Sequence, residues 1–547
     1  MNLRNEIVLL AIGCLFFNQT VWAAQAIPST QEYFDKNISK KGNGNIVFAF
    51  SDTDSVASSE IKFYLTKLVI SKVIGDNGID KDLQRIIRSY EQKEVSIEDL
   101  NKAVVAITTC FRENGYPAAT AYLPQQESKD GSIQINVEEG RYGKIIIENG
   151  SRLKTKVVER LSSVLHEGEI IRTKKLETVL HNIIDLGGVR AGGIMRPGTA
   201  IGETDIVIRV EDGKRDSYVL YSENHGSKSS GRYRYGVAAN WYELAGVGDH
   251  LTINGSVSNE EQHNYGIQYD QLIGKDGTKL GISVSRTDYE LGSHYSAIGA
   301  VGEATTVGVN GSTPLWKTST SRMGVYYGWD YRKLQDELRE FDYLIEKHSN
   351  AFYLSINGME NISKTNLNYD LTFYVGRLSY DDAHIGSIPL QVENDGKYSK
   401  ALLNISALHR FDRNVDLLVK AQVQQAENNL DSSEQIYLGG ANAVRAYPQG
   451  EASGDEGYQA TAELRYHTKV SGLTVSTFFD VGHVKYTQNG SMPGGTTLKG
   501  WGIGIAYNEP NGYWARVDYA RRIGLAKDAT DDAKDKDRIW FVVGKSW

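Results

Sequence analysis

The chain has 547 residues and a formal net charge of -8, with 40% hydrophobic residues, 55 Gly and 32 Tyr but only 9 Pro and 2 Cys. Apart from a short run near the amino terminus, no apolar stretch approaches the ~20 residues of a membrane-spanning helix, which excludes a helical membrane protein. The mildly acidic balance argues against a dedicated nucleic-acid-binding protein, since such proteins normally carry a basic surface. A membrane β-barrel is not excluded, because barrel strands alternate lipid-facing and lumen-facing side chains and look polar on average.

The first 23 residues are predicted to be a secretory signal peptide. Arg4 precedes an apolar run over residues 7–17, and small residues in the segment 21–26 follow at the spacing that signal peptidase recognises. A lipoprotein signal at Gly13-Cys14 is the disfavoured alternative, because the apolar run continues past the cysteine. The exact cleavage site is left open. Removal of the signal would leave Cys110 as a single thiol, so no disulfide framework is expected.

Two passages of mixed strands and helices follow, and each is predicted to be a small α+β module. In the first, a strand over 61–73 precedes a helix over 81–90, and a capping box at Ser96-Ile97-Glu98-Asp99 opens a second helix. Short strands over 118–123 and 132–137 close this module. The second module repeats the order strand, helix, helix, strand, strand with the segments 142–148, 154–165, 173–186, 189–195 and 205–210. Apolar residues recur at helical spacing in each helix, which predicts that the helices cover three-stranded sheets.

From about residue 216 to the last residue, apolar and polar side chains alternate with a period of two. Val237, Ala239 and Trp241, for example, alternate with Ala238 and Asn240. About 16 such segments, most of them near ten residues long with Tyr or Trp near their ends, predict a 16-stranded antiparallel transmembrane β-barrel with both ends in the periplasm. A soluble β-sandwich is the rival, but its strands would typically be shorter.

The connections between these segments alternate in length. The segments 243–248, 286–295 and 469–472 are short or modest, whereas 381–397, 428–456 and 524–537 are long, polar and charged. We expect the long connections to be the outer loops, because outer loops of such barrels are longer than the periplasmic turns.

The connection 428–456 carries the most informative residues of the chain. It contains Val444-Arg445-Ala446-Tyr447 in a Gly-rich stretch, and a later segment contains Phe478-x-Asp480-x-Gly482. Strand alternation turns Phe478, Asp480 and Gly482 toward the lumen. We therefore expect the loop to fold inward and to bring Arg445 against Asp480, with Gly482 leaving room for a guanidinium or a ring. An isolated pair in a wet lumen contributes only about 0–1 kcal/mol, so its main effect is to fix the position of the loop.

These two signatures resemble the paired motifs of the two-partner secretion outer-membrane transporters (TpsB type), the ShlB/FhaC/HecB-like haemolysin secretion/activation family, which joins POTRA modules to a 16-stranded barrel. The chain departs from the loop motif at Ala446, where Gly is usual. The resemblance implies a loop-barrel lock made of Val444, Arg445, Tyr447, Phe478, Asp480 and Gly482.

The resemblance also implies the division of the chain. The parts are a signal peptide (1–23), an amino-terminal segment (24–60), a first POTRA module (61–139), a second POTRA module (140–213) and a barrel (214–547) with the loop 428–456 folded inward. Whether residues 30–41 form a short helix that plugs the pore, followed by a linker, stays open.

The function implied by the resemblance is a pore in the outer membrane of a Gram-negative cell. POTRA modules would catch an unfolded partner in the periplasm, and the barrel would pass it to the surface without ATP. The expected partners are a secreted TpsA-type exoprotein (an adhesin, haemolysin or contact-dependent toxin), outer-membrane lipid, and the barrel-assembly machinery through the strand that ends at Trp547. The chain is expected to be a monomer without a nucleic-acid partner or cofactor. The partner's identity and the POTRA residues that contact it stay open.

The same fold is compatible with two other functions, a barrel-assembly insertase and a passive porin, and an enzyme is a third alternative. A barrel-assembly insertase of the same superfamily usually has more POTRA repeats, and a passive porin needs none. Asp381-Asp382-Ala383-His384 could activate water, but without a facing second pair it is interpreted as a solvated outer loop. His225, His409 and His467 are isolated in the sequence, so no metal site is predicted.

Overall fold

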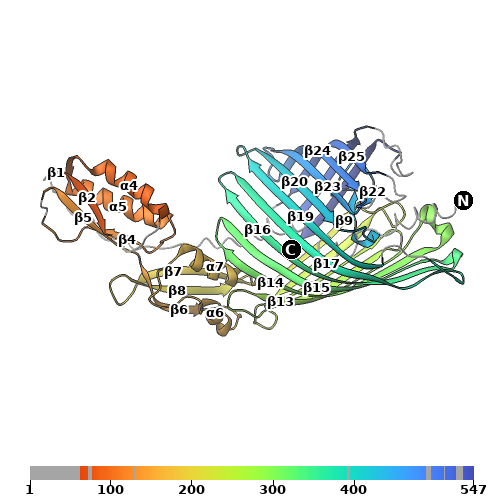
Figure 1. The fold of residues 1–547 in the computed structure, drawn as a ribbon, viewed down its shortest axis with the longest axis horizontal. Coiled ribbons are helices and arrows are strands. Elements are labelled where there is room, and N and C mark those ends of the chain that lie inside the picture. Colours follow the sequence, from red (N-terminus) through yellow and green to blue (C-terminus); the bar gives the residue numbers. More distant parts are fainter. Residues whose placement is uncertain are drawn as a thin grey trace.

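The computed structural model describes residues 62–71, 77–127, 130–390, 395–487, 494–509, 512–524 and 534–547. Two small α+β modules precede a closed antiparallel barrel of 16 long strands, which confirms the predicted fold class (Figure 1). The predicted signal peptide (1–23) and the segment 30–41 lie outside the described residues. Among the helices that the structure describes, none is both long and apolar enough to cross a membrane.

The first module buries its core between two helices and a small sheet. Its elements are β1 (Lys62–Leu65), β2 (Lys67–Ser71), α4 (Asn77–Tyr90), β3 (Lys93–Ser96), α5 (Ile97–Glu113), β4 (Thr120–Tyr122) and β5 (Ser132–Glu138). Strand β5 pairs with β2 in parallel and with β4 antiparallel, while β1 pairs with β3. The prediction of one unbroken strand over 61–73 was wrong, because Thr66 separates β1 from β2. Strand β3 was not predicted. Strand β3 has four residues and buries only Val95, so its sequence shows no period of two.

Helix α5 begins at the predicted capping box, which the structure confirms. The Ser96 hydroxyl accepts a hydrogen bond from the Asp99 backbone N–H (3.1 Å), and the Asp99 carboxylate accepts one from the Ser96 N–H (3.0 Å). These two bonds satisfy donors that the first turn of a helix cannot pair internally. Farther along the same helix, Cys110 is a buried free thiol.

Replacing Ser96 with Ala should loosen α5 without unfolding the barrel. Loss of an N-cap side chain costs about 1 kcal/mol, because the amide of Asp99 loses its acceptor. Hydrogen–deuterium exchange on the full-length protein should show about fivefold faster exchange in the first turns of α5. Thr109→Ala, on the exposed face of the same helix, is the matched control and should leave that exchange unchanged. Equal exchange in both variants would show that the box does not hold the helix.

The second module has the element order that the sequence predicted. Its elements are β6 (Arg141–Asn149), α6 (Thr155–Ser162), α7 (Thr173–Ile184), β7 (Val189–Pro197) and β8 (Glu203–Asp212). Strand β8 lies between β6, with which it is parallel, and β7, with which it is antiparallel. Helices α6 and α7 bury apolar side chains such as Leu161, Leu176 and Leu180 against this sheet.

Helix α7 also packs on the rim of the barrel. The Thr178 hydroxyl accepts a hydrogen bond from the Lys317 backbone N–H (3.0 Å), and the Asn182 amide donates to the Asp276 carbonyl (2.8 Å). Asp185 pairs with Lys317 at 2.9 Å. Burial opposes ionisation of Asp185, but the nearby cations outweigh it and lower the pKa of this carboxyl. The second module is therefore bound to the turns at one end of the barrel by hydrogen bonds to the backbone and by an ion pair.

The barrel is formed by strands that run along the carboxyl-terminal two thirds of the chain. They are β9 (Asp216–Glu223), β10 (Arg234–Tyr242), β11 (Asp249–Ser258), β12 (His263–Leu272), β13 (Lys279–Glu290), β14 (Ala300–Lys317), β15 (Ser321–Leu338), β16 (Tyr343–Ile362), β17 (Thr365–Ile385), β19 (Gly396–Arg410), β20 (Val415–Ala426), β23 (Glu456–His467), β24 (Leu473–Lys485), β25 (Thr496–Asn508), β26 (Tyr513–Arg522) and β27 (Asp537–Ser546), with the short β18 (Ile388–Pro389) beside β17. Strand β27 pairs with β9 and closes the barrel.

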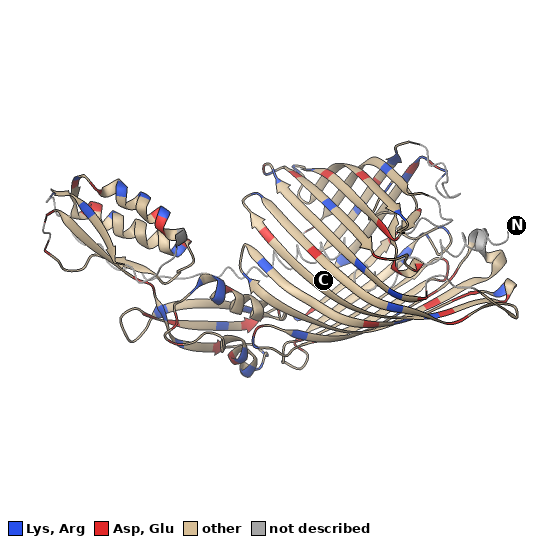
Figure 2. Cartoon of the chain, in the orientation of Figure 1, with Lys and Arg blue, Asp and Glu red and all other residues tan. Residues whose placement is uncertain are grey.

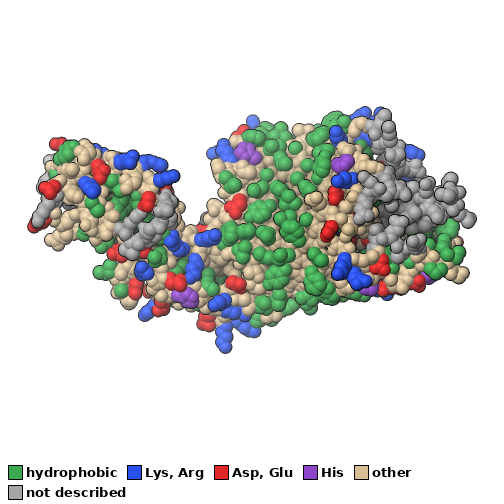
Figure 3. Space-filling view, in the orientation of Figure 1, with side chains coloured by type: hydrophobic (Ala, Val, Ile, Leu, Met, Phe, Trp, Pro, Cys, Tyr) green, Lys and Arg blue, Asp and Glu red, His purple; other side chains and the backbone are tan. Residues whose placement is uncertain are grey.

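The outer wall of the barrel is apolar, and the lumen is polar. Alternate residues such as Val237, Ile282 and Phe352 are exposed on the outside. Figure 3 shows these hydrophobic side chains spread over the barrel wall, and Figure 2 shows Lys, Arg, Asp and Glu concentrated on the modules and toward the strand ends. A wall of this kind suits contact with lipid hydrocarbon.

The lumen face is not uniform around the barrel. Along β10 to β13, alternation with the exposed apolar set turns mostly Gly, hydroxyl and amide residues inward. These inward residues are Arg234, Gly236, Ala238, Asn240, His250, Thr252, Asn254, Ser256, Asn264, Gly266, Gln268, Asp270, Gly281, Ser283, Ser285 and Thr287. Buried ionic side chains gather instead on β15, β16 and β19 and on β23, β24 and β26.

Two predictions about connections are corrected. Residues 286–290 belong to strand β13, and the connection after it contains a 3-10 helix (Ser293–Ile298). This connection, like the loop after β20, follows a strand that runs away from the second module, so it lies at the far end of the barrel and not among the turns beside the module. The cluster Asp381 to His384 lies inside β17 and not in a loop, because β17 runs 21 residues and stays paired with the 20-residue β16 as far as Ile385.

Candidate functional site: a loop folded into the barrel lumen

The connection between β20 and β23 folds back as a small hairpin inside the barrel. It contains a 3-10 turn (Ser432–Glu434) and strands β21 (Ile436–Leu438) and β22 (Ala452–Gly454), which pair with each other. Gly439 and Gly440 turn the chain after β21 with φ of 87° and 112°, values that favour glycine. The hairpin thereby presents residues 441–449 to one wall of the lumen.

Arg445 at the tip of this hairpin binds Asp480 of β24 through three hydrogen bonds. Its Nε and Nη2 atoms donate to the two carboxylate oxygens, each at 2.9 Å, and its backbone N–H donates to Oδ2 at 3.1 Å. Arg445 is 5% exposed and Asp480 is fully buried. The fork geometry and the shielding from water make this contact stronger than an exposed ion pair. The structure thus brings together the two residues that the sequence paired.

A wider ionic cluster surrounds this pair, and sequence reasoning missed it. Arg445 Nη1 also donates to Glu463 of β23 (3.1 Å) and to Asp518 of β26 (3.3 Å). Both carboxylates in turn bind Arg516, and Glu463 binds Arg465. The cluster therefore has three guanidinium groups and three carboxylates and is neutral as a whole, which limits the cost of burying its charges. The sequence feature that could have indicated this cluster is the charge at alternate, inward-facing positions of β23 and β26.

Apolar packing fixes the height of the hairpin tip. The guanidinium carbon of Arg445 lies 3.2 Å from the centre of the Phe478 ring, and Val444 and Tyr447 are buried beside it. Gly482 leaves room for the loop, because a Cβ there would lie 2.7 Å from the Leu438 side chain. All six predicted lock residues, Val444, Arg445, Tyr447, Phe478, Asp480 and Gly482, thus lie within one contact region.

Ala446 occupies the position where the resemblance led us to expect glycine. Its φ is not in the left-handed region, so glycine is not needed for the backbone here. Its methyl group is buried against Gly500, where a Cβ would lie 2.5 Å from it. The extra methyl group is therefore accommodated by a glycine in the facing wall.

The last strand of the barrel also contacts the tip. Trp540 of β27 donates its indole N–H to the Arg445 carbonyl at 2.7 Å. Next to Trp540, the side chain of Asn224 bonds the backbone of β27 at Ile539 and Phe541, and so extends the ladder between β27 and β9 beyond the end of β9. The lock is thus connected to the strand pair that closes the barrel.

The base of the hairpin has a second ionic anchor on the opposite wall, which the sequence did not predict. Asp431 binds Lys347 of β16 at 2.8 Å. Glu434 binds Arg332 of β15 at 3.0 Å and Lys400 of β19 at 2.9 Å. All five side chains are buried, with exposed fractions of 9% or less. The loop therefore crosses the lumen from the wall of β15 to β19 to the wall of β23 to β27.

The Asp and His residues at the outer end of β17 form two pairs. His384 binds Asp382 (3.1 Å), as the sequence suggested, and His348 of β16 binds Asp381 (2.8 Å), so the expected absence of a second pair was wrong. All four side chains are 28% to 52% exposed. Within the described residues, no group of three or more His, Cys, Asp or Glu side chains could hold a metal ion.

Comparisons with known proteins match the chain to one secretion family and to transporters similar to it. A family model described as haemolysin secretion/activation protein ShlB/FhaC/HecB matches residues 202–507, and a model for the ShlB-type POTRA domain matches residues 74–140. The heme/hemopexin transporter protein HuxB of Haemophilus influenzae (strain 86-028NP) is 28% identical over 502 residues, covering 89% of this chain and 88% of HuxB. The hemolysin transporter protein HpmB of Proteus mirabilis is 21% identical, covering 86% and 83%. The solved structure of CdiB from Escherichia coli has a similar fold, with a TM-score of 0.70 at 17% identity over 96% of this chain and 98% of CdiB.

Proposed function

Because the chain belongs to the haemolysin secretion/activation family ShlB/FhaC/HecB and is a two-partner secretion transporter, we propose that it forms an outer-membrane pore for one cognate exoprotein. The observation that carries this proposal is the doubly anchored hairpin inside the lumen. A loop held at both walls narrows the lumen until the partner arrives, and the POTRA modules, which a passive porin does not need, argue against a porin. The loop-barrel lock of Arg445 and Asp480 is proposed to hold this loop in place.

The two POTRA modules are proposed to catch the partner in the periplasm. Strands β2 and β4 are the edges of the first sheet, and β6 and β7 are the edges of the second. An extended chain can add a strand to such an edge through main-chain hydrogen bonds, which suits an unfolded partner because little side-chain sequence is read. Docking of α7 on the barrel rim keeps the second module at the lumen mouth.

The proposed partners follow from this placement. They are a secreted TpsA-type exoprotein, the lipid of the outer membrane, and the barrel-assembly machinery, which would read the strand ending at Trp547. We propose a monomer in the outer membrane with the modules in the periplasm. We assign no catalytic role to His384, because its pair with Asp382 stands on the exposed end of a strand, where both side chains are open to solvent.

Secretion of a cognate exoprotein tests the proposal. The wild-type transporter should release that protein into the medium, and a transporter lacking residues 62–138 should not, because the first module makes the initial contact. Surface labelling and heat-modifiable gel mobility would show that the shortened barrel is still inserted and folded. Undiminished release by the shortened transporter would contradict capture by this module, and release without any transporter would contradict the whole proposal.

A further inference from the structure

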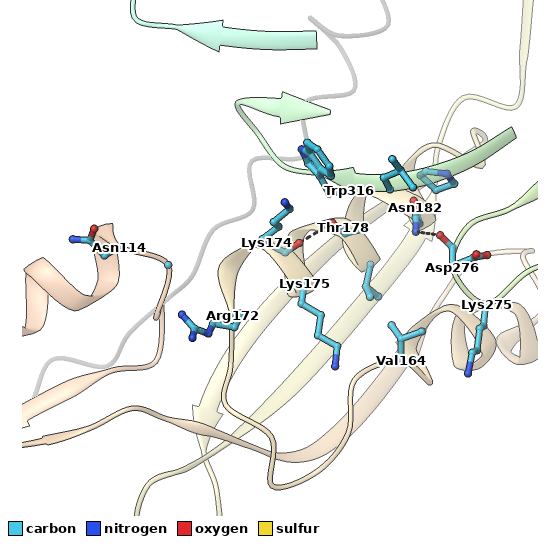
Figure 4. A pocket seen from close by; sticks show the side chains of 14 residues that line it. Asn114, Val164, Arg172, Lys174, Lys175, Thr178, Asn182, Lys275, Asp276 and Trp316 are labelled. Carbon is cyan, nitrogen blue, oxygen red and sulfur yellow. Dashed lines mark hydrogen bonds between the residues drawn. The ribbon is translucent and has the colours of Figure 1, made fainter. Parts of the chain in front are cut away.

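A pocket of about 610 Å³ lies where α7 meets the periplasmic ends of β13 and β14 (Figure 4). Helix α7 contributes Lys174 and Thr178, the turn between β12 and β13 contributes Lys275, and β14 contributes Leu315 and Trp316. This volume is within the range of about 300–1,000 Å³ that is usual for small-molecule sites. The lock at the centre of the lumen takes no part in this pocket.

One side of the pocket is strongly cationic. Four cations line it, Arg172, Lys174, Lys175 and Lys275, of which Lys175 is paired with Glu169, and the lining itself contains one carboxylate, that of Asp276. The Asp276 carboxylate accepts a hydrogen bond from the backbone N–H of Thr278. Lys174 lies over the Trp316 ring, 3.8 Å from its centre, and neither Lys174 nor Lys275 forms an ion pair with a described residue. The charge of this side therefore favours an anionic ligand.

The other side of the pocket continues the lipid-facing wall. On β14 the outward row runs through Val307 and Val309, and Leu315, at a bulge near the end of the strand, is 50% exposed. On the neighbouring turn, Ile273 is 48% exposed. A Trp beside such an apolar edge is typical of the boundary between hydrocarbon and headgroups. The pocket therefore lies at the level of the periplasmic leaflet and outside the lumen through which an exoprotein would pass.

We propose that this pocket binds the phosphate-bearing headgroup of an anionic phospholipid from the periplasmic leaflet. Lys174 and Lys275 contact the phosphate, Trp316 packs on the glycerol region, and the acyl chains follow Leu315 along the barrel wall. The bound lipid joins α7 to the membrane surface and helps to hold the second module at the rim. This inference rests on the outer-membrane placement of the barrel and not on translocation, so it can fail while the proposed function stands.

Native mass spectrometry of the full-length protein in detergent, with added phosphatidylglycerol or phosphatidylethanolamine, tests this site. The wild type should retain phosphatidylglycerol more strongly, and Lys174→Glu with Lys275→Glu should weaken that retention about tenfold, since each cation near an anionic lipid contributes measurably. The matched control, Lys62→Glu with Lys67→Glu on the exposed face of the first module, should behave as the wild type. Heat-modifiable gel mobility checks that each variant is folded.

Other outcomes would overturn the proposal. Equal lipid retention by the pocket variant and the control would show that the headgroup binds elsewhere. Displacement of phosphatidylglycerol by equimolar inorganic phosphate would show a free-phosphate site without a membrane source. If the pocket variant lost binding to a synthetic acidic peptide but retained phosphatidylglycerol as the wild type does, the pocket would be assigned to a protein ligand instead.

Discussion

Arg445→Ala should reduce release of the exoprotein by at least about tenfold while leaving the barrel inserted in the membrane. Removing this guanidinium leaves the carboxylates of Asp480, Glu463 and Asp518 with less counter-charge in a buried site. Breaking a buried ion pair by removing one partner costs about 3–5 kcal/mol, which would displace the hairpin tip from the wall. The amount of exoprotein in the medium and surface labelling of the transporter measure the two effects separately.

Two control variants accompany this result, a conservative substitution at the same position and a substitution far from the hairpin. Arg445→Lys should also fail in large part, because an ammonium cannot make the forked contact with Asp480. Arg413→Ala, in an exposed periplasmic turn, should secrete normally. Exchanging the charges as Arg445→Asp with Asp480→Arg should not restore release, because the new carboxylate would face Glu463 and Asp518. Normal release by Arg445→Ala would show that the lock is dispensable.

Glu434→Ala should weaken the second anchor, at the base of the hairpin. Arg332 and Lys400 would lose the carboxylate that they share, whereas the pair of Asp431 with Lys347 and the Lys400 bond to the carbonyl of residue 434 would remain. We expect hydrogen–deuterium exchange in β21 and β22 to rise about tenfold and the open-channel current to become noisier, because part of one anchor is lost. Secretion should fall less than in Arg445→Ala, since the tip remains bound.

Two further variants separate charge from packing at this anchor. Changing Arg332, Lys400 and Glu434 together to Met should restore slow exchange, because well-packed apolar residues can replace a buried ionic group. Glu427→Ala, at the mouth of the same loop, removes an exposed contact with Ser399 and should leave exchange unchanged. If Glu434→Ala exchanges as slowly as the wild type, the ion pairs of Glu434 do not hold the loop.

Much of the barrel could be predicted because its signal is local. A period of two identifies each strand and says which face each residue occupies, and this placed Asp480 and Phe478 in the lumen without a structure. The second module followed from helical spacing in the same way. Strand β3 escaped prediction because four residues with one buried position show no period.

The ionic partners in the lumen could not be predicted because they depend on the height of each residue in the barrel. Alternation shows that Glu463 and Arg516 face inward, but their meeting depends on the stagger between strands, which accumulates around the barrel. The same is true of Glu434, whose partners come from β15 and β19. Only a closed barrel fixes which inward side chains share a level. For Arg445 and Asp480, the motif resemblance supplied this missing information.

The polarity of the lumen wall differs around the barrel, and this difference affects a chain in transit. The hairpin spans the walls that carry buried ions, and the facing wall of β10 to β13 presents mainly hydroxyl, amide and Gly groups. A net hydrogen bond to such a group is worth about 0.5–1.5 kcal/mol and exchanges readily with water, so no single position there holds a passing segment for long. Most positions on this wall therefore offer a passing segment only weak contacts that exchange with water. We therefore expect this wall to let a long polypeptide move past through weak contacts that depend little on its sequence.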